Sequence, residues 1–181
     1  MRIRSLMVVP ASIAAVAAFL AGGAHAVGGA CSSGQVLKSK SYVFALSIGP
    51  LTQMYTEAQV KAKHPKSGEV MLSGSMSVGM SGMGMSSSGQ RHLEVHICST
   101  AGAVVMGGHP TIVVDDPKAT TMTISVPIAT MEGVKAGASD YHYGNNIALT
   151  AGHQITVTVT LKGQEVVFHT VVSKPAMSMS G

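Results

Sequence analysis

The chain has few aromatic residues, few charged residues and only two cysteines. Among its 181 residues, aromatic side chains make up 4%, tryptophan is absent, and charged side chains make up 11%. The low aromatic content excludes the base-stacking surfaces of single-strand nucleic-acid binders. Two cysteines exclude a multi-disulfide miniprotein and a four-cysteine zinc site. Hydrophobic residues make up 46%, which is typical of globular proteins and excludes a mostly disordered chain.

The net charge of the chain is low for a nucleic-acid-binding or membrane-surface protein. It amounts to +4 at neutral pH. Such a small excess of basic residues predicts neither a nucleic acid nor an anionic membrane as a partner.

The first 26 residues predict a secretory signal peptide. Arg2 and Arg4 form a basic start, residues 6–20 are uncharged and apolar, and Ala24 and Ala26 form an A-x-A cleavage site. We therefore expect an exported protein, located in the periplasm, the cell envelope or outside the cell. A lipid anchor at Cys31 is the alternative, but a bulky residue before that cysteine is missing.

Export bears directly on the two cysteines, Cys31 and Cys98. Because exported proteins meet an oxidising compartment, we expect these residues to form one disulfide. The alternative is a pair of free thiols, with Cys98 as a soft metal ligand.

The composition of the remaining chain changes several times along its length. Residues 27–40 are rich in Gly and Ser and predict a flexible N-terminal arm. Residues 56–63 predict a short helix, because Thr56 is a suitable N-cap. Residues 73–89 consist almost entirely of Ser, Gly and Met and predict a loop, and residues 174–181 predict a disordered tail.

Most of the other segments predict short strands. Apolar and polar residues alternate in several of them, as expected for strands with one buried face. The predicted strands cover residues 41–48, 91–98, 103–106, 110–114, 121–128, 153–161 and 165–172. The last two are joined by Lys162 and Gly163 and predict a hairpin. We therefore expect residues 41–173 to form an all-β domain, an immunoglobulin-like antiparallel β-sandwich.

Histidine and methionine are the residues that suggest metal binding. The chain contains 8 His and 13 Met. Imidazole and thioether together suit copper, above all Cu(I), whereas imidazole with carboxylate also suits Fe(II) or Zn(II). His92, Glu94 and His96 alternate along one predicted strand, so all three project from the same face and can bind one ion. The alternative is a polar, solvated sheet face.

The Ser/Gly/Met segment supplies a second group of metal-ligand candidates: Met76, Met80, Met83 and Met85. A Gly/Ser loop offers no core for methionine to fill, so packing does not explain these residues well. Flexible thioethers can surround a soft monovalent ion. The alternatives are drift in a tolerant linker and sacrificial oxidation of exposed thioethers.

One segment has a family resemblance. Residues 138–147, Ala-Ser-Asp-Tyr-His-Tyr-Gly-Asn-Asn-Ile, resemble the Ser-Asp-x-x-His-Tyr-Gly-x-Asn signature of the periplasmic ferrous-iron transport protein family, with one residue fewer between Asp and His. Residues 46–54 are similar to that family's early strand and Pro-x-x-Met turn, and residues 92–96 resemble its His-x-Glu-Ala-Asp strand. Members of the family are dimeric, immunoglobulin-like proteins that bind copper and iron beside an iron permease. The resemblance implies the same fold, a homodimer and a membrane metal permease as partner.

The resemblance also implies a set of metal ligands. The family's loop histidine, which is a ligand, corresponds to His142. Two further family positions hold Arg91 and Cys98 here, and Arg cannot bind a cation. The implied ligand set is therefore shifted, and it consists of His142 and His96, with His92 as the alternative imidazole, Met54 or a loop methionine as thioether, and Glu94 as a supporting or iron-specific carboxylate.

These observations predict an exported metal-binding protein that holds or delivers copper or ferrous iron. The alternative is a non-catalytic secreted sandwich that binds another protein and has no tight metal site. An enzyme is not expected, because the sequence contains no Gly-x-Ser-x-Gly elbow, His-Glu-x-x-His helix or phosphate loop. Cys98 and His96 are the one Cys/His pair, and nothing near them in the sequence supplies the orienting third group.

Overall fold

A computed structural model describes residues 29–75 and 89–174 of the chain. The predicted signal peptide, Met76, Met80, Met83, Met85 and nearly all of the predicted tail lie outside the described residues. Those predictions therefore stay predictions.

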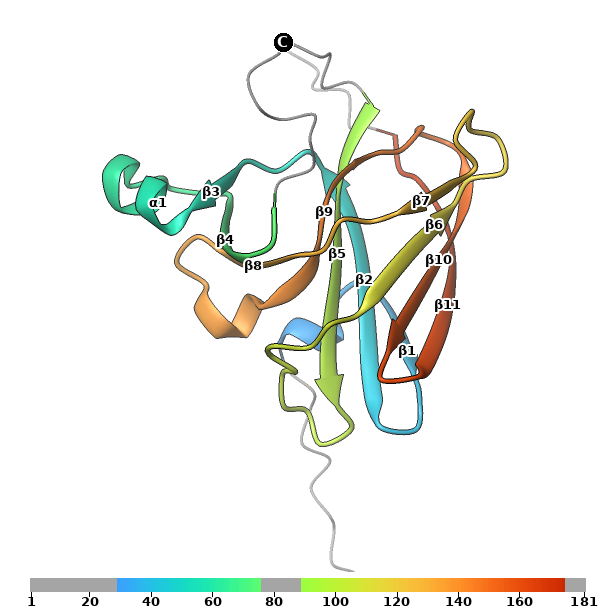
Figure 1. Ribbon diagram of the computed structural model, residues 1–181, viewed down its shortest axis with the longest axis horizontal. Coiled ribbons are helices and arrows are strands. Elements are labelled where there is room, and N and C mark those ends of the chain that lie inside the picture. Colours follow the sequence, from blue (N-terminus) through green and yellow to red (C-terminus); the bar gives the residue numbers. More distant parts are fainter. Residues whose placement is uncertain (1–28, 76–88, 175–181) are drawn as a thin grey trace, which may run out of the picture.

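Two β-sheets make up the described part of the protein (Figure 1). The larger sheet has the order β1-β2-β5-β9-β8-β4-β3 and the smaller one has the order β11-β10-β6-β7. The strands of the larger sheet are β1 Gln35–Lys38, β2 Tyr42–Pro50, β5 Gln90–Ser99, β9 His142–Ala148, β8 Ala129–Gly133, β4 Glu69–Ser73 and β3 Met54–Thr56. Those of the smaller sheet are β11 Gln164–Val171, β10 Gln154–Leu161, β6 Thr111–Asp115 and β7 Thr123–Ser125. Neighbouring strands are antiparallel except β3 and β4, which are parallel.

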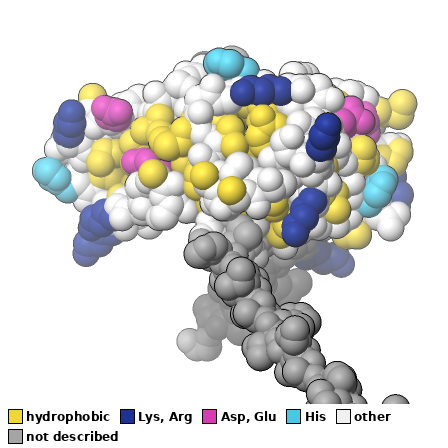
Figure 2. Space-filling model, turned by 90° about the horizontal axis from the view of Figure 1, so that it is seen from below, with side chains coloured by type: hydrophobic (Ala, Val, Ile, Leu, Met, Phe, Trp, Pro, Cys, Tyr) yellow, Lys and Arg dark blue, Asp and Glu magenta, His cyan; other side chains and the backbone are white. Residues whose placement is uncertain are grey.

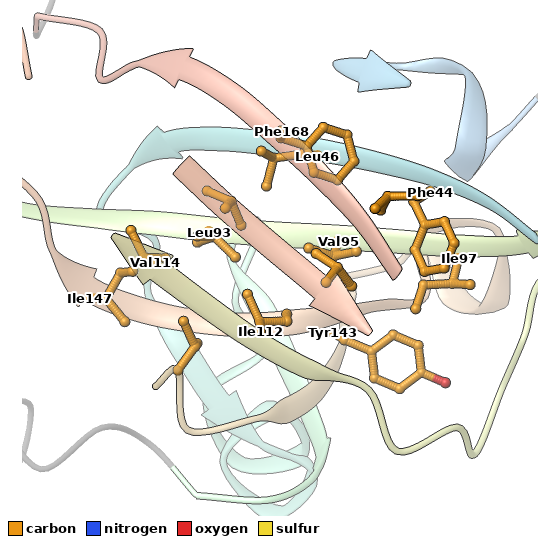
Figure 3. Packing of buried hydrophobic residues seen from close by; sticks show 14 of the residues in the cluster. Phe44, Leu46, Leu93, Val95, Ile97, Ile112, Val114, Tyr143, Ile147 and Phe168 are labelled. Carbon is orange, nitrogen blue, oxygen red and sulfur yellow. The ribbon is translucent and has the colours of Figure 1, made fainter. Parts of the chain in front are cut away.

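The main core lies between the two sheets. In β5, Leu93, Val95 and Ile97 are fully buried and face this core, because successive residues of a strand point to opposite faces. Figure 3 shows such side chains from both sheets pointing toward one another, among them Ile112 of β6 and Phe168 of β11. The prediction of an all-β sandwich is confirmed, whereas an immunoglobulin-like topology is not.

The predicted hairpin and helix are both present. Strands β10 and β11 pair up to Leu161 and Gln164. Lys162 and Gly163 between them have φ values of 48° and 72°, as a two-residue type I′ turn requires. Helix α1, Glu57–Lys63, begins with a capping box in which Thr56 and Gln59 satisfy each other's backbone N–H groups. It stands with β3, β4 and β8 on one flank of the sandwich, away from the smaller sheet (Figure 1).

The N-terminal segment is better ordered than its composition predicts. The prediction of a flexible arm over residues 27–40 is wrong for most of that range, because β1 pairs with β2 and a 3-10 helix, η1, spans Ala30–Ser32. The predicted disulfide between Cys31 and Cys98 is confirmed, and both residues are buried. Backbone pairing and a covalent link to β5 therefore hold a segment whose Gly and Ser content alone favours mobility.

Two of the predicted strands are wrong or too long. Residues 103–106 form only an isolated bridge between Val104 and Cys98, and of residues 121–128 only β7 is a strand. His142, which was expected in a loop, is the first residue of β9. A short 3-10 helix, η3 Gly137–Asp140, ends directly before it.

The surface offers no concentrated basic patch on the face seen in Figure 2. Its Lys and Arg side chains are spread singly around apolar surface. Among the helices in the described part of the chain, none is long and apolar enough to cross a bilayer.

Candidate metal centre

The candidate centre lies on the face of the larger sheet that points away from the main core. Since Leu93 and Val95 face that core, His92, Glu94 and His96 project from the opposite face of β5. All three histidines of the centre are almost completely buried: His92, His96 and His142 are 0%, 3% and 0% exposed. The interpretation of this strand face as a polar, solvated surface is therefore wrong.

Hydrogen bonds fix the orientation of two of the imidazole rings. Nδ1 of His142 lies 2.7 Å from the carbonyl oxygen of Asp140, and Nδ1 of His96 lies 3.1 Å from that of Tyr141. Because a carbonyl oxygen only accepts, each Nδ1 carries the proton and donates. In the neutral ring, Nε2 is then left with a free lone pair, which is the arrangement found in metal-binding histidines.

The third imidazole is fixed through an amide. Nδ1 of His92 lies 2.9 Å from Oδ1 of Asn146, the residue opposite it on β9. The amide orientation follows from its other end, since Nδ2 of Asn146 donates to the carbonyl of Thr52 at 2.8 Å. Oδ1 must therefore accept from His92, so the Nε2 lone pair of this ring is also free.

Two carboxylates face the three Nε2 atoms. The carboxylate of Glu94 lies between two rings, with Oε1 at 3.6 Å from Nε2 of His92 and Oε2 at 3.7 Å from Nε2 of His96. Oε2 of Glu69, on β4, lies 3.8 Å from Nε2 of His142. These separations are too long for hydrogen bonds. They suit atoms that share one ion, each about 2 Å from it.

Three polar atoms of the centre are buried without any hydrogen-bond partner: Nε2 of His92, Nε2 of His142 and Oε2 of Glu69. A buried polar atom without a partner costs free energy, on the order of 1–3 kcal/mol. Three such atoms pointing into one space are therefore a feature that packing alone does not explain. A bound cation satisfies all three together.

Burial and mutual charge set the protonation of the group. Burial, together with the nearby carboxylates of Asp140 and Glu94, raises the pKa of Glu69 to about 7. Burial lowers the pKa of His92 and of His142. Both of these imidazoles are therefore neutral at neutral pH, as metal ligands must be.

Glu94 and His96 shift in the opposite sense to that expected from burial. Burial alone raises the pKa of Glu94, but the surrounding imidazoles outweigh it and the pKa is lowered. Burial alone lowers the pKa of His96, but the adjacent Glu94 carboxylate raises it overall. Glu94 is therefore ionised at neutral pH, and its carboxylate lies between the rings of His92 and His96.

The ligand atoms fall into two groups, each within 4.8 Å. The first consists of Glu69, His92, Glu94 and His142, and the second of His96, Asp140 and His142. His142 therefore belongs to both groups, with His92 in the first and His96 in the second. His92 and His96 fall into different groups because they are four residues, and roughly 13 Å of strand, apart.

Methionine thioethers line one side of the centre. Met131 on β8 lies directly opposite His142 in the sheet register, so the two side chains are neighbours on the same face. Met54 lies opposite Glu69 on the adjacent strand pair. Met54 and Met131 are 1% and 0% exposed and belong to one small apolar cluster with Ala129 and Met71.

Sequence reasoning missed Glu69, Asp140 and Met131. The sequence predicts no strand at β4 or β8, so it does not place Glu69 or Met131 on the histidine-bearing face. Asp140 stands out in the sequence only as part of the family-like segment. The one signal for β8 is the alternation of buried Ala129 and Met131 with more polar residues, and it covers only five residues.

The structure also shows the roles of Arg91 and Cys98, which stand at two positions where the resembled family has other residues. Cys98 is in the disulfide and is therefore not a metal ligand. Arg91 has the same parity as Leu93, so its buried side chain projects from the other face of β5.

The residues thus define a buried imidazole–carboxylate site, with thioethers beside it, on the outer face of a β-sandwich. No protein-family model, no curated protein and no solved structure matches the chain.

Proposed function

We propose that the protein is an exported metal-binding protein that holds or delivers copper or ferrous iron outside the cytoplasm. The observation that carries the proposal is the convergence of buried, unpartnered ligand atoms from His92, His142 and Glu69 around the carboxylate of Glu94. A protein that only packs its core gains nothing from leaving such atoms unsatisfied.

The donor set supports a transition metal over a hard cation. Imidazole nitrogen suits copper, iron and zinc, whereas Mg²⁺ and Ca²⁺ prefer all-oxygen sites. The nearby thioether of Met131 adds a soft donor, which favours copper. The carboxylates of Glu69 and Glu94 suit Fe(II) in combination with two imidazoles.

Export is supported by two independent features. Residues 1–26 have the pattern of a secretory signal. The disulfide between Cys31 and Cys98 suits an oxidising compartment, where such bonds persist.

Anaerobic titration with Cu(I), Cu(II) and Fe(II), followed by elemental analysis, tests the proposal. We expect tight binding of at least one of these ions by the wild-type protein. We expect the same binding after Met76, Met80, Met83 and Met85 are all replaced by leucine, because the converging ligand atoms lie on the sheet.

Failure of the wild-type protein to retain any of the three ions contradicts the proposal. A secreted sandwich that binds another protein then becomes the better explanation. Binding that disappears with the four methionines contradicts the placement of the site on the sheet, because the thioether segment then holds the ion.

A further inference from the structure

A groove lies at one end of the sandwich, along the edge of β9. It has a volume of about 560 Å³ and runs between the end of β9 and the segment that carries β7. Ile124, Ile147 and Leu149 contribute apolar surface to it, and none of its lining side chains is charged. A hollow of this size with an uncharged, partly apolar lining is typical of a binding site for an uncharged group.

Beside this groove the backbone of β9 has an unpaired edge. The pairing of β8 with β9 ends at Gly144, and no other strand in the described part of the chain continues it. The N–H of Leu149 donates to the carbonyl of Gly89, on the β5 side. Because backbone groups alternate in direction along an antiparallel strand, the N–H and C=O of the exposed Ala148 point the other way. An open edge of this kind is a template for another extended segment.

The described part of the chain ends close to this groove. The start of β5 and the ends of β9 and β11 lie at the same end of the sandwich (Figure 1). Val172 is bound to the turn before β10, because its N–H donates to the carbonyl of His153 and its carbonyl accepts from Gly152. Thr150, in the same turn, lines the groove. Seven extended residues span roughly 23–25 Å, so residues 175–181 are long enough to enter it.

The sequence of residues 175–181 suits both the groove and the edge. It reads Pro-Ala-Met-Ser-Met-Ser-Gly and carries no charged side chain. Met and Ser alternate, so in an extended conformation Met177 and Met179 project to one side, and Ser178 and Ser180 project to the other. Thioether side chains adapt to irregular apolar hollows, whereas hydroxyl groups suit the solvent side.

We propose that residues 175–181 bind in this groove as a strand added to the edge of β9. The backbone of the segment pairs with Ala148, and the side chains of Met177 and Met179 pack on the apolar lining. The inference does not depend on bound metal.

Peroxide oxidation of the metal-free protein, with residues 175–181 intact, tests the inference. Met106 and Met122 are 55% and 60% exposed and serve as internal references. We expect Met177 and Met179 to be oxidised at least about threefold more slowly than these two, because oxidation follows exposure. Peptide mapping by mass spectrometry measures the four rates.

Matched substitutions within the segment test which side of it is buried. Met177→Asp with Met179→Asp places charge in an uncharged groove and should release the segment. Ser178→Asp with Ser180→Asp adds the same charge on the solvent side and should leave it bound. Both pairs leave every residue of the two sheets unchanged. Hydrogen exchange of the Ala148 amide, followed by NMR, should be at least about tenfold slower in the serine variant and the wild-type protein than in the methionine variant.

Thr121→Arg tests the groove itself. Thr121 is exposed and lines the groove, so an arginine there obstructs it without changing the core. Met177 and Met179 should then be oxidised as fast as Met106. Thr100→Arg, at an exposed position beyond the other end of β5, is the control and should leave the slower oxidation intact.

Three results would overturn the inference. The first is oxidation of Met177 and Met179 in the wild-type protein at the rate of Met106. The second is slow exchange of the Ala148 amide that persists in the methionine variant, because another group then covers the edge. The third is protection of Ala148 that increases with protein concentration, because the segment of a second copy then occupies the groove.

Discussion

Replacing His142 with alanine is expected to lower the affinity for copper at least about 100-fold, since loss of even an outer-shell partner costs 10–100-fold. This ring belongs to both ligand groups, and its Nε2 is buried without a hydrogen-bond partner. Its removal therefore takes a direct ligand from the ion and leaves Oε2 of Glu69 without the atom it faces. Competition against a chromophoric chelator of known affinity measures the change.

The matched control for His142→Ala is His169→Ala, on β11 of the other sheet. His169 is exposed and lies outside both ligand groups, so its removal should leave copper affinity unchanged. His142→Gln is included as well, because it retains side-chain volume and separates loss of a ligand from loss of packing. An unaltered copper affinity in both His142 variants would remove this residue from the site.

The sequence predicts the elements whose signal is local. The β10–β11 hairpin follows from alternating Val and Thr residues around Lys162 and Gly163, and α1 follows from the cap at Thr56. Strands β3, β4 and β8 have three to five residues each, too few for a period-two pattern to stand out. Their pairing is long-range, as in the register of Glu69 with Gly133, and no local pattern encodes it.

The candidate site, too, depends on long-range strand pairing that no local sequence pattern encodes. The strand parity of His92, Glu94 and His96 places all three on one face, and the structure does so. Parity does not reveal that His92 and His96 lie in different ligand groups, because that depends on where β9 and η3 bring His142 and Asp140. Glu69 enters from a strand that is remote in sequence, and its role follows only from the distance to His142.

Glu69→Gln is expected to make the metal-free protein more stable at pH 8 and, at the same time, to weaken metal binding by at least about tenfold. The carboxyl group of Glu69 is largely buried, and burial together with the charges of Asp140 and Glu94 raises its pKa to about 7 from an ordinary value of 4.5. Folding therefore favours the protonated form, and ionisation at higher pH destabilises the folded state.

The direction of the pH dependence follows from this shift. Below about pH 4.5 the carboxyl group is protonated in both the folded and the unfolded state, and it has no pH-dependent effect on stability. Between pH 4.5 and about 7 the unfolded state loses its proton first, so the free energy of unfolding falls as the pH rises. The full shift corresponds to about 3 kcal/mol. Because the side chain keeps some contact with solvent, we expect the glutamine variant to gain about 1–2 kcal/mol at pH 8.

Urea unfolding of the metal-free proteins at pH 4.5 and pH 8 measures this difference. Wild-type protein and Glu69→Gln should differ little at pH 4.5, and the variant should be more stable at pH 8. Glu132→Gln, on the neighbouring β8 and outside both ligand groups, is the matched control and should show neither effect.

The two readouts of Glu69→Gln distinguish a functional carboxylate from a structural one. A structural carboxylate stabilises the fold, so its replacement lowers stability whether or not metal is present. A buried carboxylate that serves as a metal ligand destabilises the metal-free protein. Binding of the cation compensates this loss of stability. Added metal should therefore raise the stability of the wild-type protein well above that of Glu69→Gln at pH 8 and reverse their order. Equal stability of the two metal-free proteins at pH 8 would contradict the raised pKa, and an unchanged order with metal present would exclude Glu69 as a ligand.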